Sequence, residues 1–321
     1  MNIAHNPHDK ETYFSKSRRN KGYNQVHLNA LYDLRNHFYL DAVVQPARLE
    51  YENGAFRTMV DRYPGKSPTI FIADRAYESY NNMAHVTERG MYFLIRAKDI
   101  NSSGIISGLK SQLPDSDTFD LNFELILTYR SSKDIVSHPE IYKCVRTKGF
   151  LDVVDLDKQP YYPLKFRILK FPITDKTYEC VITNLPQESF SPTEIRRLYG
   201  LRWGIETSFR ELKYAVSVTN FHSKKLEYIQ QEIWARLLLY NFSQVIIVNT
   251  VIDKSKKKHD YQVNFTMAMH ICRFFLQKMA DMHPPDVELL ISKEILPIRP
   301  NRVYPRKVFY QKFVSFTYRA S

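Results

Sequence analysis

The chain has 321 residues, which is enough for one large domain or two domains of moderate size. Lysine and arginine together number 46 and aspartate and glutamate 34, so the formal net charge is +12. Such a surplus favours a polyanion as partner, because each phosphate neutralised by a lysine or arginine releases counterions. A globular protein that is merely basic would carry the same charge, so composition alone leaves both interpretations open.

The cysteines and the hydropathy pattern indicate in which cellular compartment the protein is expected. Cys144, Cys180 and Cys272 are far apart and form no CxxC pair, which argues against a disulfide framework and against a structural zinc site. No apolar run reaches the roughly 18–20 residues that a membrane span requires, and the N-terminus has no apolar signal region. We therefore expect a cytoplasmic, nucleoid-associated protein with no membrane partner.

The first elements predicted along the chain are two strands and a helix. Residues 24–32 and 38–44 have strand-like patterns, and the break at Arg35-Asn36-His37 suits a hairpin turn. A helical stretch follows at roughly 49–63.

The next elements surround an aspartate. The short apolar run at 69–73 is typical of a strand buried on both faces, and it ends in Asp74. A second helix is predicted near 79–90 and another strand at 91–96. This order of strands and helices predicts an α/β fold in which helices cover a mixed sheet.

The pattern changes in the middle of the chain. From about 100 to 187 it is β-rich, with apolar runs at 123–129 and 164–169. Helical periodicity returns from Thr193 to about Val251. The tail beyond Pro284-Pro285 is basic and aromatic, and we assign it no element.

The segment from Tyr199 to Lys213 carries the most chemistry. If it forms one α-helix, five polar side chains fall within a strip of about 80°, with apolar side chains opposite. The strip holds Tyr199, Arg202, Glu206, Arg210 and Lys213, and the apolar side holds Leu201, Ile205, Leu212, Ala215 and Val216.

Two interpretations of this strip are open. It could be a solvated face held by the pairs Arg202–Glu206 and Glu206–Arg210, each contributing about 0.2–0.5 kcal/mol. It could instead be a site where Glu206 holds a divalent metal ion while the cations and the phenol bind phosphates. Asp74 allows a similar choice, because aspartate often caps turns, but α/β proteins bind ligands at the carboxyl ends of strands.

Both segments resemble those of a known family. Tyr199, Arg202, Glu206 and Lys213 have the spacing of the Y-R-E-K signature of insertion-sequence-4-like DDE transposases, and the residues around them are similar too. Residues 72–81, which include Asp74, resemble the region of that family's second catalytic aspartate. The resemblance covers essentially the whole chain.

The resemblance implies a ribonuclease H-like catalytic domain with a β-rich insertion. It also implies that three carboxylates hold two Mg²⁺ or Mn²⁺ ions, with Asp74 and Glu206 as the second and third acids. Tyr199, Arg202 and Lys213 match positions that contact phosphates of the transposon end, and Arg210 lies in the same strip. The chemistry expected is phosphoryl transfer.

The domain organisation follows from the same comparison. Residues 1–99 are expected to form the first part of the catalytic domain and 100–187 the insertion. Residues 188–255 would be the second part, with the glutamate-bearing helix, and 256–321 a basic C-terminal region.

The first acid of the family has no match in this sequence. In relatives this acid lies in an Asp-Gly dipeptide shortly before a stretch similar to residues 2–7. We therefore expect the chain as numbered to start after this acid and to be inactive or impaired. Asp9 and Asp41 are the nearest acids that could replace it. We expect Asp9 to be a polar loop residue and Asp41 to lie within a strand, and neither to be a metal ligand. We interpret His5 and His8 as part of a polar terminus rather than as metal ligands.

Three functions fit these observations. The first is an insertion-sequence transposase that cleaves and joins double-stranded DNA at transposon ends and targets, with a homodimer as the expected assembly in the DNA complex. The second is a non-catalytic DNA-binding remnant or a domesticated copy. The third is a nuclease with the same metal site but no strand transfer.

Overall fold

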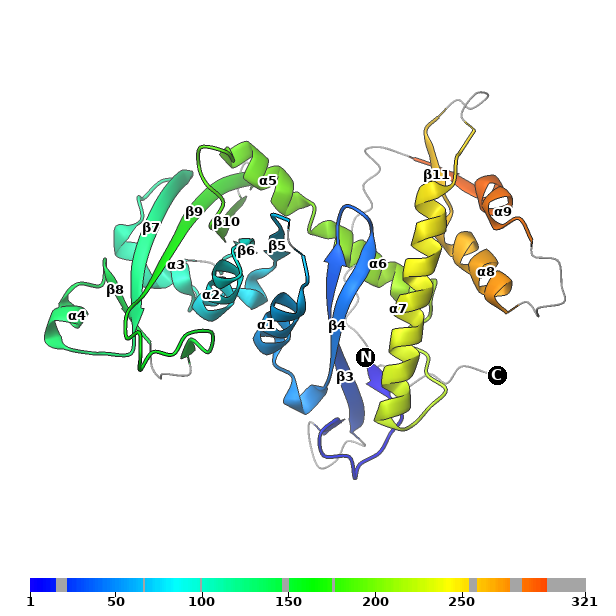
Figure 1. The fold of residues 1–321 in the computed structure, drawn as a ribbon, viewed down its shortest axis with the longest axis horizontal. Helices are drawn as coiled ribbons and strands as arrows, with labels where there is room; N and C mark the ends of the chain where they lie inside the picture. Colours follow the sequence, from blue (N-terminus) through cyan, green and yellow to red (C-terminus); the bar gives the residue numbers. More distant parts are fainter. Residues whose placement is uncertain are drawn as a thin grey trace. The chain divides into compact units, whose positions relative to one another are not determined.

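The computed structural model describes residues 1–15, 22–65, 67–98, 100–145, 150–174, 177–253, 259–277 and 285–298 (Figure 1). The chain divides into two compact units. Unit 1 comprises residues 1–50 and 204–321, and unit 2 comprises residues 51–203.

Unit 1 is built on an antiparallel hairpin. Its strands are β1 (Asn2–Ile3), β2 (Tyr13–Phe14), β3 (Tyr23–Asp33) and β4 (Phe38–Pro46), and β3 pairs with the other three. The turn between β3 and β4 is held by Asp33, whose carboxylate accepts from the backbone N–H groups of Arg35 and Asn36 at 2.8 and 3.1 Å. His37 completes it with a positive φ of 62°. The predicted hairpin is confirmed.

Helices complete unit 1. They are α6 (Trp203–Tyr214, whose first residue is assigned to unit 2), α7 (Leu226–Asn249), α8 (Phe265–Leu276) and α9 (Val287–Lys293). A small hairpin of β11 (Tyr261–Val263) and β12 (Ile295–Pro297) accompanies them. Asn241 of α7 ties this helix to β4 by exchanging two 2.8 Å hydrogen bonds with the backbone of Tyr39. The elements α9 and β12 lie in the tail to which the sequence assigned none.

Unit 2 contains a mixed six-stranded sheet in the order β5-β6-β10-β9-β7-β8. The strands are β5 (Ile70–Ala73), β6 (Tyr92–Arg96), β7 (Phe119–Thr128), β8 (Tyr142–Cys144), β9 (Tyr162–Thr174) and β10 (Thr177–Thr183). β5 and β6 are parallel, as are β7 and β8, and the other pairs are antiparallel. The expected mixed α/β character is therefore confirmed.

Periodicity predicted three helices of unit 2, which are α1 (Glu52–Arg62), α2 (Tyr80–Glu88) and α5 (Pro192–Gly200). It did not predict the short helices α3 (Ile105–Gly108) and α4 (Lys133–Ser137), which lie in the region expected to be β-rich. The strands β7 to β10 join the same sheet as β5 and β6 rather than forming a sheet of their own. Whether residues 100–187 are an insertion stays a prediction, as do the domain boundaries.

One detail of β5 differs from expectation. Phe71 and Ala73 are buried, whereas Ile70 and Ile72 are only partly buried. The strand is thus not buried evenly on its two faces. It lies at one end of the described sheet, where a strand has a partner on one side only.

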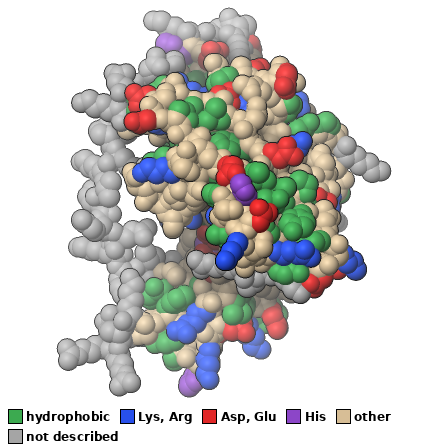
Figure 2. Space-filling model, turned by 90° about the vertical axis from the view of Figure 1, so that its left-hand side faces the viewer, with side chains coloured by type: hydrophobic (Ala, Val, Ile, Leu, Met, Phe, Trp, Pro, Cys, Tyr) green, Lys and Arg blue, Asp and Glu red, His purple; other side chains and the backbone are tan. Residues whose placement is uncertain are grey.

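The described residues contain no helix with both the length and the apolar composition needed to cross a membrane. On the face of the molecule drawn in Figure 2, acidic and basic side chains are interspersed rather than separated by sign.

A buried ion pair joins β7 to β9. Arg167 is only 1% exposed. Its Nε donates to Oδ1 of Asp120 and a terminal nitrogen donates to Oδ2, each at 2.5 Å. The guanidinium also donates to the carbonyl of Phe190 at 2.8 Å. On the same two strands, Glu124 and Lys165 form an exposed pair at 3.4 Å.

These two pairs allow a matched test of stability. We expect Asp120→Ala to lower the free energy of unfolding by about 3–5 kcal/mol, because it leaves the Arg167 charge buried without its carboxylate. Glu124→Ala should lower it by less than about 1 kcal/mol, because solvent already screens that pair. Urea denaturation of both variants measures the difference, and equal losses would contradict this account of the sheet.

Candidate active site

Asp74 occupies the end of β5 and begins a short 3₁₀ helix, Arg75–Tyr77. Its Oδ1 accepts from the backbone N–H of Ala76 at 2.9 Å, so the aspartate does serve as a cap. Capping uses one carboxylate oxygen, and the side chain is only partly buried. The position therefore serves the turn and still presents a carboxylate at the carboxyl end of a parallel strand.

Other acids of unit 2 are bound into the fold. Glu78 accepts from the backbone N–H groups of Lys98 and Ile105 at 2.7 and 2.5 Å. Asp61 and Asp152 contact the two ring nitrogens of the buried His85 at 2.9 and 2.6 Å. These carboxylates bind the backbone of other elements or a buried imidazole, whereas the carboxylate of Asp74 accepts only from its own turn.

Tyr199 does not lie on an exposed strip, contrary to the sequence-based prediction. It belongs to α5, is 5% exposed, and packs in an apolar cluster with Leu94, Leu169 and Ile195. Burial raises the pKa of its phenol above the ordinary value. Its ring nevertheless supports a cation, because the Arg202 guanidinium carbon lies 5.5 Å from the ring centroid.

The segment 199–213 is not one helix, so the prediction of a single polar strip is wrong. α5 ends at Gly200 and α6 begins at Trp203. Between them, the N–H groups of Leu201 and Arg202 bond three residues back, to Leu198 and Tyr199, at 3.1 and 3.0 Å. This tighter turn breaks the 100° spacing on which the strip depended.

The physical cause of the break is local. Glycines stand on both sides of it, at 200 and 204, and each is about 1 kcal/mol less favourable than alanine inside a helix. A Cβ on Gly204 would lie 2.8 Å from Leu34 Cδ2, so glycine also lets α6 approach the β3–β4 turn closely. Leu201, expected on an apolar face, is exposed.

The other three residues of the predicted strip lie together on α6. Glu206, Arg210 and Lys213 are all exposed, and they lie within about 60° of one another around the helix axis. Ser208 and Leu212 are buried on the other side. One acid thus shares an outward face with two cations, an arrangement that could bind a metal ion and a phosphate together.

The alternative acids and histidines have ordinary roles. Asp9 accepts from the Thr12 hydroxyl at 2.6 Å and from nearby backbone N–H groups, as a loop residue does. Asp41 lies within β4. His5 packs edge-on against Tyr13, and the backbone N–H of His8 donates to Asn6.

An imidazole–carboxylate pair escaped sequence reasoning. His27 Nδ1 lies 2.9 Å from Glu50 Oε1, and both side chains are about one third exposed. The two residues are 23 positions apart, so no local motif could reveal them.

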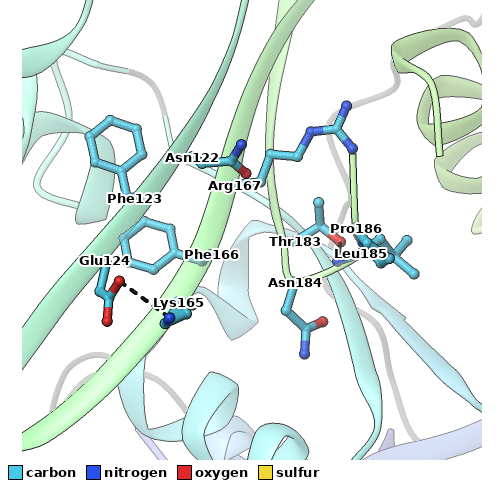
Figure 3. Close-up of a pocket in the computed structure, with 10 residues that line it drawn as sticks. All are labelled: Asn122, Phe123, Glu124, Lys165, Phe166, Arg167, Thr183, Asn184, Leu185 and Pro186. Atoms are coloured by element: carbon cyan, nitrogen blue, oxygen red, sulfur yellow. Dashed lines mark hydrogen bonds and ion pairs between the residues drawn. The ribbon is translucent and has the colours of Figure 1, made fainter. Parts of the chain in front are cut away.

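A cavity of about 410 Å³ in unit 2 is not part of this site. It lies beside β7 and β9, where Phe123 and Phe166 stack with ring centroids 5.7 Å apart (Figure 3). Its Asn184 bonds the backbone of Phe93 and Met91. Asn184 therefore ties β6 to the segment after β10, and neither Asp74 nor Glu206 lines the cavity.

Comparison with known proteins decides the family. The family described as "Transposase DDE domain" matches residues 2–242. The chain belongs to this family. The predicted relationship to DDE transposases is thereby confirmed, and both Asp74 and Glu206 fall inside the matched range.

The chain is also similar to a curated protein and to a solved structure. Transposase InsG for insertion sequence element IS4, from Escherichia coli K12, is 28% identical over 128 residues, or 37% of this chain and 29% of that protein. A solved piggyBac transposase synaptic complex with hairpin DNA aligns with a TM-score of 0.46 and 10% identity. That alignment covers 91% of this chain and 56% of the solved one. The chain thus spans under a third of the curated relative and about half of the solved chain.

Variants of Asp74 can separate its two roles. Asp74→Asn should leave the free energy of unfolding nearly unchanged, because the amide oxygen can still accept from Ala76, whereas Asp74→Ala should lower it by about 1 kcal/mol. Both variants should lose divalent-metal binding, measured by the electron paramagnetic resonance signal of free Mn²⁺. If Asp74→Asn binds Mn²⁺ as tightly as the parent, Asp74 is a cap and not a ligand.

Proposed function

We propose that this chain acts in DNA transposition by metal-dependent phosphoryl transfer, with Asp74 and Glu206 as carboxylate ligands of Mg²⁺ or Mn²⁺. The observation that carries the proposal is the outward face of α6, where Glu206 lies with Arg210 and Lys213 inside the range matched by the family. The ribonuclease H-like fold, the insertion at 100–187 and action at the nucleoid belong to the same proposal.

The residues fit the metal that the family uses. Mg²⁺ prefers carboxylate oxygens and usually keeps several waters, so two accessible acids suit it better than a closed cage. Asp74 needs only one oxygen for its cap, and Glu206 is exposed. When bound, paired Mg²⁺ ions would activate the attacking oxygen and stabilise the leaving oxygen.

The cations of the chain would bind and orient the DNA backbone. Arg210 and Lys213 would neutralise phosphates beside Glu206, and Arg202 would do so from its place against Tyr199 and Trp203. The buried Tyr199 would support Arg202 rather than touch phosphate itself. The expected partners are the double-stranded ends of the element and its target, with a homodimer as the assembly on DNA.

Binding to duplex DNA should fall steeply with salt. Lys213→Ala should weaken it and reduce the magnitude of the log–log salt slope by about 1, the amount expected for one lost phosphate contact. Lys158→Ala, which removes an exposed lysine paired with Asp155 in unit 2, serves as the control and should change neither. Titrations of labelled DNA between about 50 and 200 mM salt test this. Equal slopes for the parent and Lys213→Ala would contradict the assignment.

A second candidate function is DNA binding without cleavage. By resemblance, Asp74 and Glu206 match two of the family's three acids, and no residue of this sequence matches the first. The exposed cations of α6, Arg210 and Lys213, would serve DNA binding in either case.

Cleavage assays separate these functions. If the chain cleaves DNA, the parent should nick the element's ends at least roughly 100-fold faster than Glu206→Gln, because losing a carboxylate misplaces the metals. Mg²⁺- or Mn²⁺-dependent nicking of end DNA measures both rates. A parent that binds end DNA but nicks it no faster than Glu206→Gln would contradict the catalytic proposal and support the second function.

A further inference from the structure

The inward face of α6 carries two polar side chains within unit 1. Ser208 is 1% exposed, and its hydroxyl lies 2.8 Å from the hydroxyl of Tyr39 on β4. Glu211 is partly buried, and its Oε2 accepts from the hydroxyl of Tyr240 on α7 at 2.9 Å. At 100° per residue, both lie on the side of α6 opposite Glu206 and Lys213.

Tyr240 is the central residue of a buried hydrogen-bond network that includes Glu211. It is fully buried, and its hydroxyl lies 3.1 Å from the Tyr32 hydroxyl and accepts from Gln244 Nε2 at 3.1 Å. A phenol has one proton to donate and two lone pairs with which to accept. Tyr240 therefore donates its hydroxyl proton in a hydrogen bond to Glu211, while its two lone pairs can accept from Tyr32 and Gln244.

Keeping an acid in this place is unfavourable for stability. Burial raises the pKa of Glu211 above the ordinary value, which means that the charged form is disfavoured there. An apolar side chain would fit the neighbouring core, which includes Leu212 and Leu237, without that penalty. What the carboxylate adds is direction, since a hydrogen bond fixes an angle and apolar packing does not.

We propose that Glu211 is a positioning residue: through Tyr240 it fixes the rotation of α6 about its axis, and so holds Glu206, Arg210 and Lys213 on one outward face. The inference rests on the proposed function, since those three residues are its proposed metal and phosphate contacts. A rotation of about 20° would move a side chain at the helix surface by about 2 Å. Displacements of that size are enough to disrupt a metal site.

Three variants test the proposal by ligand binding. Glu211→Leu removes the acceptor, Glu211→Gln keeps an acceptor oxygen, and Leu237→Ala disturbs the same core without touching the hydrogen bonds. We expect Glu211→Leu to weaken both Mn²⁺ and duplex DNA binding about tenfold, with Glu211→Gln within about twofold of the parent. Leu237→Ala should lower the melting temperature but leave both affinities unchanged. Equal weakening by Leu237→Ala and Glu211→Leu, or no rescue by glutamine, would overturn the proposal.

A distance measurement tests the rotation without any ligand. Spin labels at Thr207→Cys on α6 and Gln231→Cys on α7, both exposed positions of unit 1, report the orientation of α6 after Cys144 and Cys180 are replaced by serine. The distance distribution should be narrow in the parent and in Glu211→Gln, and shifted or broadened in Glu211→Leu. An unchanged distribution in Glu211→Leu would refute the positioning role. A parent that binds neither Mn²⁺ nor DNA would instead refute the proposed function, and this measurement would still decide the role of Glu211.

Discussion

The hydroxyl of Tyr240 is the point on which unit 1 depends. Through it, α7 is bonded to α6 by Glu211 and to β3 by Tyr32, while the Tyr39 ring on β4 packs edge-on against Tyr240 with centroids 4.9 Å apart. Burial raises the pKa of Tyr32 to about 12 and raises that of Tyr240 as well, so both phenols stay protonated and able to donate. The helix that carries Glu206 is thus held by directional bonds as well as by apolar packing.

Unit 2 uses its charges differently. Two of its carboxylates bind buried cationic or imidazole side chains: Asp120 neutralises Arg167 inside the sheet, and Asp152 bridges His85 and Arg57. Desolvation alone would raise the pKa of Asp152, but hydrogen bonds from His85 and Asn81 hold this pKa below its ordinary value. Against this background Asp74 stands out, because it ends a strand, caps only one N–H group and remains partly accessible. A strand end is a rigid place for a metal ligand, since the sheet fixes the backbone that carries it.

Local patterns predicted the elements well and the helix break poorly. The β3–β4 hairpin, α1, β5, α2 and β6 follow from alternation, turn residues and short apolar runs, which act over a few neighbouring residues. The interruption between α5 and α6 lies between two weakly helical glycines, at 200 and 204, and helical periodicity does not record it. The sequence also did not predict the burial of Tyr199, because the spacing of the motif carries no information on the apolar cluster around this residue. Motif resemblance proposed Asp74 and Glu206 as site residues, whereas it gave no sign of a role for Glu211, because its partner Tyr240 is 29 residues away.

The central proposal is that Asp74 and Glu206 are ligands of divalent metal ions. Bound Fe²⁺ in place of Mg²⁺, with ascorbate and peroxide, generates hydroxyl radicals that cut the protein backbone close to the ion. Mapping the cuts by mass spectrometry in the parent, Asp74→Asn and Glu206→Gln tests each proposed ligand. The account predicts cuts near both residues in the parent, the loss of the cuts near residue 74 in Asp74→Asn, and the loss of those near residue 206 in Glu206→Gln. A parent without cuts near either residue, or variants that keep the cuts of the parent, would contradict it.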